Sequence, residues 1–172
     1  VETSYQEPTC TEKGVKTYTC ETCGETYKDT GYDTLIDSSR YPQSEHNYSN
    51  SMDKTWYFTQ KGADHLDLVF YEDCWLETNY DYLYIYDSEG NQVAKYNGSF
   101  GNQKLTVSGD SFTARLTTDG SVVGYGFSFA SITARYEYNP TGHSYELISS
   151  VAPTCTENGM GTYKCSVCGD IY

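Results

Sequence analysis

Residues 70–87 read Phe-Tyr-Glu-Asp-Cys-Trp-Leu-Glu-Thr-Asn-Tyr-Asp-Tyr-Leu-Tyr-Ile-Tyr-Asp, and the pattern within this stretch indicates the class of fold. In its second half Leu83 and Ile85 alternate with tyrosines, a period of two that is typical of a strand with one buried face. Similar short runs recur from Trp56 to Phe129, and turn signals such as Asn97-Gly98 separate them. No helical period of useful length is present, so we expect an antiparallel β-sandwich or barrel.

Composition supports strands and turns. The chain has 19 tyrosines and 15 glycines among 172 residues, and few helix-favouring residues. Opposed sheets would bury the apolar member of each alternating pair. The polar members predicted to face solvent are Asp67, Thr113, Arg115 and Ser128.

The charge of the chain argues against some classes of partner. Acidic residues outnumber basic ones 24 to 11, for a formal charge of -13, and no Lys/Arg cluster is present to bind phosphates. We therefore expect no nucleic-acid partner; the carboxylates suit a divalent cation or simply a solvated surface. No apolar window is long enough for a membrane span, and the first residues lack the features of a signal peptide, so we expect a mature fragment.

The stretch 70–87, taken with Leu116–Phe127, resembles the CUB family. The matching residues are Glu77, Tyr80-Asp81-Tyr82 with Asp87, Asp119 and Gly126-Phe127. The resemblance covers residues 41–136 and implies a CUB-like sandwich of the jelly-roll type over 38–138. In calcium-binding CUB domains one ion is held by three acids, which the resemblance places at Glu77, Asp81 and Asp119.

Carboxylates are suitable ligands for such an ion, because Ca²⁺ takes 6 to 8 hard oxygens. An exposed site of this kind is expected to bind weakly, with a Kd on the order of 10⁻⁴ M. Glu72, Asp73 and Asp87 are alternative ligands nearby, and Glu72 is close enough in sequence to replace Glu77. The simpler alternative is that these are ordinary loop acids, with an Asp-Gly turn at Asp119.

The seven cysteines form two triplets around a single Cys74. With no partner in the sandwich, Cys74 is expected to be a free, buried thiol. The lack of a disulfide pattern in the sandwich is a feature of the bacterial, CUB-like branch of the resemblance.

The ends of the chain are copies of one unit. Pro8–Tyr27 matches Pro153–Tyr172 at twelve of twenty positions, which is hard to obtain by chance. We therefore predict small Cys-rich β-hairpin repeats at residues 1–32 and 140–172, both partial. The first copy runs on past the position where the second stops, so a longer protein with further copies is expected.

Each copy reads Cys-x9-Cys-x2-Cys-Gly, and a C-x2-C-G turn lets two thiolates bind one metal ion. The predicted zinc ligands are Cys10, Cys20 and Cys23 in the first copy and His143, Cys155, Cys165 and Cys168 in the second. A disulfide with one free thiol in each copy is the alternative. If the fourth zinc ligand instead follows the Cys-x2-Cys turn, Tyr32 is the only candidate for it in the first copy. The pattern resembles zinc-ribbon-like repeats in surface proteins of gut Clostridia, in which a Gly-His commonly precedes the motif, as Gly142-His143 does.

The histidines are scattered and no nucleophile motif occurs, so we do not expect an enzyme. The predicted function is calcium-dependent binding or adhesion by a secreted or surface-displayed bacterial protein. The partner would be an extracellular protein or glycan at the calcium rim, where Trp75, Tyr80 and Tyr82 are candidate ligand-binding residues. The CUB resemblance implies contact with a Lys of the partner. The alternatives are an architectural spacer, or a carbohydrate-binding accessory module of an extracellular hydrolase.

Overall fold

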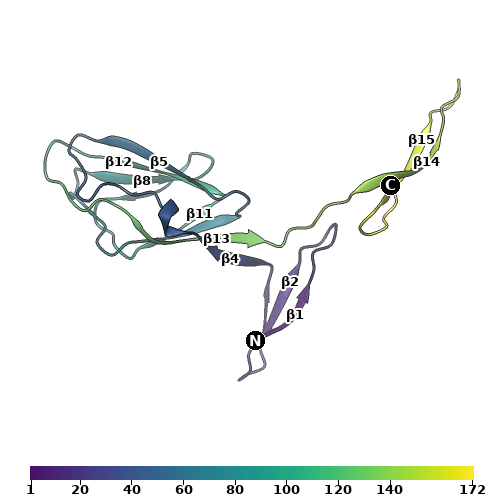
Figure 1. Cartoon of the computed structure of the whole chain (residues 1–172), viewed down its shortest axis with the longest axis horizontal. Helices are drawn as coiled ribbons and strands as arrows, with labels where there is room; N and C mark the ends of the chain where they lie inside the picture. The colour runs from purple at the N-terminus through teal and green to yellow at the C-terminus, as the bar shows by residue number, and fades with distance from the viewer. The chain divides into compact units, whose positions relative to one another are not determined.

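A computed structural model describes residues 1–172 and divides the chain into two compact units. The sandwich unit is Tyr32–Tyr136, and the repeat unit combines Val1–Gly31 with Glu137–Tyr172. The sandwich is thus an insert between the two halves of the repeat unit. Figure 1 shows the strands coloured from the N-terminus in purple to the C-terminus in yellow. No helix has the length and apolar character needed to span a membrane.

Two four-stranded sheets form the sandwich (Figure 1). One has the order β11-β6-β13-β4 and contains β4 (Gly31–Leu35), β6 (His65–Phe70), β11 (Lys104–Ser108) and β13 (Phe129–Glu137). The other has the order β5-β12-β8-β9 and contains β5 (Asp53–Thr59), β8 (Tyr82–Tyr86), β9 (Gln92–Tyr96) and β12 (Ser111–Thr117). A short antiparallel pair joins β7 (Trp75–Leu76) to β10 (Gly98–Ser99). The predicted all-β antiparallel sandwich is confirmed.

The core forms where the predicted alternation places apolar side chains. Strand β12 alternates half-buried and buried residues along its whole length, and it pairs antiparallel with β5 and β8. Leu83 and Ile85 of β8 are fully buried. Aromatic rings fill the space between the sheets: Phe70 contacts Tyr96, Phe100 and Phe129 at centroid distances of 4.9 to 5.2 Å. Period-two patterning therefore identified the buried face of these strands.

Ser128 was predicted to face solvent, but it is buried. The pairing of β13 with β6 shifts register between Phe129 and Ser131, so the regular alternation does not hold there. The Ser128 carbonyl accepts from the Cys74 thiol at 3.3 Å, and its N–H lies 3.4 Å from the same sulfur. The prediction of a free, buried thiol at Cys74 is confirmed.

The stretch Lys28–Arg40, which follows the first repeat, holds regular structure. It contains β4 at the edge of a sandwich sheet and a 3₁₀ turn at Ser38–Arg40. The side chain of Asp37 accepts from the N–H of Ser39 at 2.9 Å and so caps this turn.

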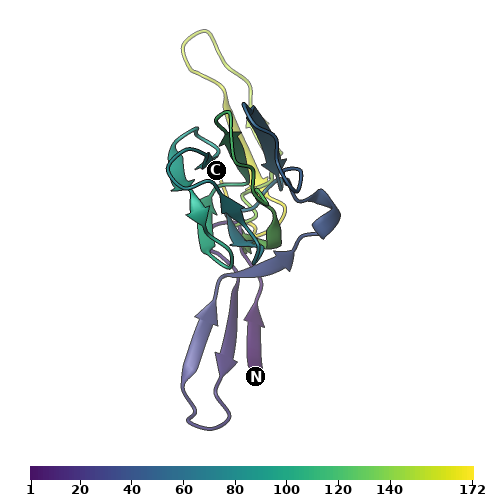
Figure 2. The same cartoon turned by 90° about the vertical axis from the view of Figure 1, so that its left-hand side faces the viewer.

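The two repeats form equivalent hairpins. The first contains β1 (Glu2–Gln6), β2 (Val15–Thr19) and β3 (Thr26–Asp29), and the second contains β14 (Tyr145–Val151) and β15 (Met160–Cys165). The closing pairs are Gln6 with Val15 and Val151 with Met160, which are equivalent positions in the two copies. Figure 2 shows the first hairpin in purple and the second in yellow. Their strands are largely exposed, so hydrophobic burial contributes little to either hairpin.

Candidate metal centres

Three carboxylates converge at one end of the sandwich. Glu77 follows β7, Asp81 precedes β8, and Asp119 lies in the loop after β12. One oxygen from each can be chosen so that all three lie within 4.8 Å of one another. Asp81 is fully buried, and the other two acids are half-buried. The strand ends thus bring together the three acids that the sequence resemblance identified.

Asp81 is held in place by donors to both of its oxygens. Oδ2 accepts from the hydroxyl of Tyr48 at 2.5 Å, and Oδ1 accepts from the backbone N–H of Asp119 at 2.8 Å. The Tyr48 hydroxyl also accepts from the N–H of Glu77 at 3.1 Å. Burial and the nearby Asp81 carboxylate raise the pKa of Tyr48 well above its ordinary value, so the phenol stays a neutral donor.

Glu77 has an unsatisfied oxygen. Its Oε2 is buried and has no hydrogen-bond partner. Burial raises the pKa of Glu77, and repulsion from Asp119 and Asp81 raises it further. A buried carboxylate oxygen without a donor is costly, and a cation among the three acids would satisfy it. The residues present therefore suit a hard divalent cation.

The loops around the acids depend on a close approach of two chain segments. Ser44 accepts from the N–H of Phe127 through its hydroxyl at 3.0 Å, and donates its own N–H to the Phe127 carbonyl at 3.0 Å. A Cβ on Gly126 would lie 1.9 Å from Ser44 Oγ, and the φ of Gly126 is +89°. Glycine is therefore required before Phe127. The N–H of Ser51 donates to the Asp119 carbonyl at 2.5 Å and joins the same segment to the acidic loop.

The alternative acids lie outside the group of three. Asp87 ends its strand as a turn cap: Oδ1 accepts from the N–H groups of Glu89 and Asn91 at 3.0 and 2.9 Å. Glu72 and Asp73 are exposed residues of the turn after β6. Neither belongs to the group of three acids.

The three candidate ligand-binding aromatics have different environments. Trp75 packs against the backbone, since a Cβ on Gly124 would lie 2.1 Å from its ring. Tyr82 lies under Lys95, whose Nζ is 3.8 Å from the ring centroid. Tyr80 is 62% exposed and adjoins Asp81 in the chain. Of the three aromatics, Tyr80 is the most available to a partner at this rim.

A second group of ligand atoms lies in the repeat unit. One atom each from Cys10, His143, Cys165 and Cys168 can be chosen so that all four lie within 4.8 Å of one another. The sulfurs of Cys10 and Cys165 are 3.8 Å apart, and Cys168 Sγ is 3.4 Å from Nδ1 of His143. Tetrahedral zinc with ordinary bond lengths separates two sulfurs by about 3.8 Å and a sulfur from a nitrogen by about 3.6 Å. This geometry suits zinc.

The Cys165–Cys168 turn has the conformation expected of a metal-binding turn. The N–H of Gly169 donates to the Cys165 carbonyl at 2.9 Å, and the N–H of Val167 approaches the Cys165 sulfur at 3.4 Å. Backbone N–H groups of Cys168 and Val167 lower the pKa of Cys165 to about 5, whereas burial raises that of Cys10 to about 11. The Cys20–Cys23 turn has the same bond, from the N–H of Gly24 to the Cys20 carbonyl.

The cysteines are grouped differently from the repeat-by-repeat assignment. Cys155 is exposed and lies outside the group, and Cys10 lies with the second copy rather than with Cys20 and Cys23. The reason is the hairpin: β15 separates Cys155 from Cys165, and a strand of its length spans roughly 17 Å. Strand β2 separates Cys10 from Cys20 in the same way. The length of the hairpin was the sequence signal that could have revealed this arrangement.

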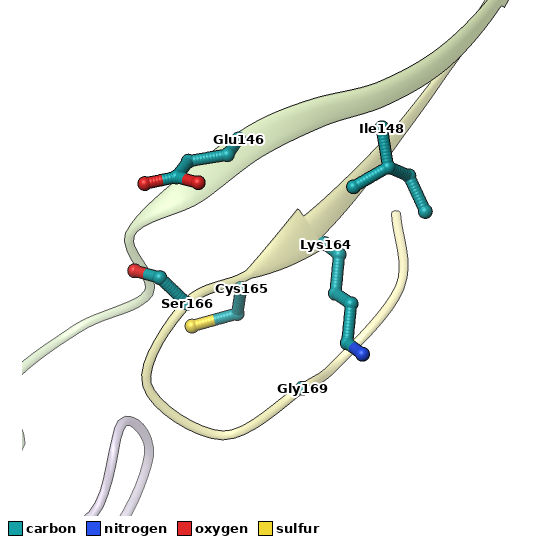
Figure 3. Close-up of a pocket in the computed structure, with 6 residues that line it drawn as sticks. All are labelled: Glu146, Ile148, Lys164, Cys165, Ser166 and Gly169. Atoms are coloured by element: carbon teal, nitrogen blue, oxygen red, sulfur yellow. The ribbon is translucent and has the colours of Figure 1, made fainter.

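An open pocket of about 390 Å³ adjoins the Cys165–Cys168 turn. Its lining residues are Glu146, Ile148, Lys164, Cys165, Ser166 and Gly169. Figure 3 shows the Cys165 sulfur pointing away from the side chains of Lys164 and Ile148. The sulfur thus belongs to the metal-ligand group rather than to the apolar part of the pocket.

Comparisons with known proteins found one family model and several solved structures. The model, described as "Uncharacterized protein E02H4.4 C-terminal domain", matches residues 24–135. No curated protein matches the chain. The MASP-1 CUB2 domain bound to Ca2+ is similar at 15% identity and a TM-score of 0.43, over 63% of this chain and 93% of that one. The CUB1-EGF-CUB2 domain of human MASP-1/3 is similar at 13% identity and a TM-score of 0.45, over 80% of this chain and 57% of that one.

Proposed function

This chain belongs to the family of the uncharacterized protein E02H4.4 C-terminal domain, and within that family we propose that it is a non-catalytic, calcium-dependent binding module. The observation that carries the proposal is the buried, unpartnered Oε2 of Glu77 beside Asp81 and Asp119. Three carboxylates at a loop end repel one another when ionised, and a bound cation would offset that repulsion.

Calcium suits this group better than a transition metal does. The donors are three carboxylates, and no His or Cys is among them. The ion would hold the loop after β7 and the loop after β12 together. Since the ion would be partly open to solvent, a Kd on the order of 10⁻⁴ M is expected, which suits an extracellular module.

The partner is proposed to bind at the rim of this calcium site. Tyr80 presents an exposed ring next to Asp81, and the acids attract a basic group. The sequence resemblance to CUB domains implies a Lys from an extracellular protein. A glycan that stacks on Tyr80 is the alternative occupant, which would make the chain an accessory module of a hydrolase.

The repeats have a structural role in this proposal, with zinc as their metal. Cys10 and Cys165 are the only buried apolar side chains of the repeat unit, so hydrophobic burial does not explain its stability. Structural zinc supplies roughly 10 to 16 kcal/mol in small domains. An architectural spacer remains the second candidate function, because the exposed hairpins suit a stalk as well as a binding protein.

Calorimetric titration with Ca²⁺ tests the ion. Glu77→Gln removes one ligand charge and should weaken binding at least about tenfold, since a charged ligand is lost from the first coordination sphere. Glu72→Gln is the matched control: the same chemical change at the alternative ligand should leave the heats unchanged. Equal heats for wild type and Glu77→Gln would refute the proposed site. A loss of calcium binding confined to Glu72→Gln would show that Glu72, and not Glu77, is the ligand.

The binding role is tested separately, on arrays of lysine-containing peptides and of glycans. Retention should require calcium and should fall on Tyr80→Ala, because the rim then lacks its exposed ring. If calcium binds but both arrays stay blank, the spacer function is favoured over the binding module.

A further inference from the structure

The two copies of the repeat use their first cysteine differently. Cys10 is buried among the ligand atoms of the second copy, whereas its equivalent, Cys155, is exposed and lies outside any group. The turn cysteines differ in the same sense: Cys165 is buried, and its equivalent Cys20 is exposed. Since the repeats are close copies, this difference reflects their neighbours rather than their own sequence.

The hairpin prevents a metal site within one copy. The first cysteine of each copy lies in the loop that joins the two strands of the hairpin. The Cys-x2-Cys lies at the far end of the second strand, roughly 17 Å away. Zinc–sulfur bonds are about 2.3 Å long, so one ion cannot reach both ends. A site with three cysteines therefore needs two copies.

Backbone contacts bring the right ends of the two copies together. The Thr9 carbonyl accepts from the N–H of Thr141 at 2.9 Å, and the Tyr138 carbonyl accepts from the N–H of Gly14 at 2.9 Å. Lys13 Nζ pairs with Glu137 at 3.2 Å. These contacts lie on both sides of Cys10 and hold its loop against the segment that leads to His143. The arrangement of the four ligands therefore does not depend on sulfur contacts alone.

We propose that one zinc ion, bound by Cys10 of the first repeat with His143, Cys165 and Cys168 of the second, joins the two repeats and closes the chain around the inserted sandwich. The inference rests on the proposed zinc role of the repeats and goes further, because it places one ion between two copies. We call this shared zinc site the clasp. The ligand set is three thiolates and one imidazole, a common closed structural zinc site.

The same geometry gives a rule for a series of copies. In such a series, the first cysteine of each repeat binds the same zinc ion as the Cys-x2-Cys of the following repeat. The Cys-x2-Cys of each repeat binds an ion together with the first cysteine of the preceding repeat. Cys155 is the donor of the second copy, and Cys20 with Cys23 is the acceptor of the first. All three are exposed, so the corresponding ligands of another copy could reach them.

Zinc content of cysteine variants tests the clasp. The full chain is purified with zinc present, desalted and measured by elemental analysis. Wild type should hold about one zinc. Cys10→Ala should lose most of it, and Cys155→Ala, the equivalent substitution in the other copy, should keep it. Loss on Cys155→Ala with retention on Cys10→Ala would overturn the clasp and leave zinc in place, within one copy.

A second variant guards against misfolding of Cys10→Ala. The triple variant Cys20→Ala/Cys23→Ala/Cys155→Ala keeps only the four proposed ligands and Cys74, and it should still bind about one metal ion. Loaded with cobalt(II), it should show the absorption of a tetrahedral site with thiolate ligands. No metal in wild type, with thiols found oxidised after denaturation, would refute both zinc and the clasp in favour of disulfides.

Discussion

The hydroxyl of Tyr48 supports two of the three acids, so its removal should destabilise the sandwich. It donates to Asp81 at 2.5 Å and accepts from the N–H of Glu77 at 3.1 Å. The Tyr48 side chain is 2% exposed and Asp81 is fully buried, so water cannot take over the bond to Asp81. Tyr48→Phe keeps the ring in the core and deletes only these two hydrogen bonds.

The expected loss follows from the two bonds. A hydrogen bond to a charged group contributes about 1.5–3 kcal/mol, and a buried peptide N–H left unpaired costs about 1–3 kcal/mol. Taking the lower part of each range, because Glu77 is half-buried, Tyr48→Phe should lower the free energy of unfolding by about 3 kcal/mol. With a urea m-value of about 2 kcal/mol/M, the midpoint should fall by about 1.5 M.

Urea unfolding followed by tryptophan fluorescence is the appropriate assay. Both tryptophans, Trp56 and Trp75, lie in the sandwich unit, so the signal reports that unit alone. Tyr57→Phe is the control, since Tyr57 is 79% exposed and the same hydroxyl is lost to solvent. A loss under about 0.5 kcal/mol for Tyr48→Phe, or an equal loss for Tyr57→Phe, would refute the reasoning.

Two further predictions concern the same loops. Gly126→Ala should lower the free energy of unfolding by more than about 2 kcal/mol, because a φ of +89° disfavours alanine and the added Cβ would lie 1.9 Å from Ser44 Oγ. Gly90→Ala is the control: Gly90 has a φ of +86° but no atom close to an added Cβ, so this change should cost only about 1 kcal/mol. A urea titration that finds equal costs would contradict the close approach at Gly126. With calcium chelated, thermal stability should fall as pH rises from 4.5 through the raised pKa of Glu77, because the folded state then binds more protons than the unfolded chain. Glu77→Gln should flatten this slope, and an unchanged slope would argue against repulsion among the acids.

Much of the fold could be predicted because its signals are local. Alternation along β8 depends only on the strand period, and it identified Leu83 and Ile85 as core residues. Ser128 escaped the prediction because a register shift lies beside it, and a pattern of period two does not reveal a bulge.

The acidic group was predicted only in part. The family pattern identified Glu77, Asp81 and Asp119, but composition and spacing alone do not say that residues about 40 positions apart meet. Nothing local marked Tyr48, whose hydroxyl bridges Asp81 and the Glu77 backbone from a distant segment. Such a bond depends on how the chain returns to the sheet ends.

The repeat, the Cys-x2-Cys-Gly turns and the alternating strands can be recognised in the sequence, because each is a short-range pattern. Which thiols meet depends instead on the tertiary structure. Two ends of an extended strand cannot share one ion, so Cys155 is kept from Cys165, and Cys10, far away in sequence, takes its place. The sandwich lies between Cys10 and Cys165 in the chain. The contacts within the repeat unit bring Cys10 close to His143.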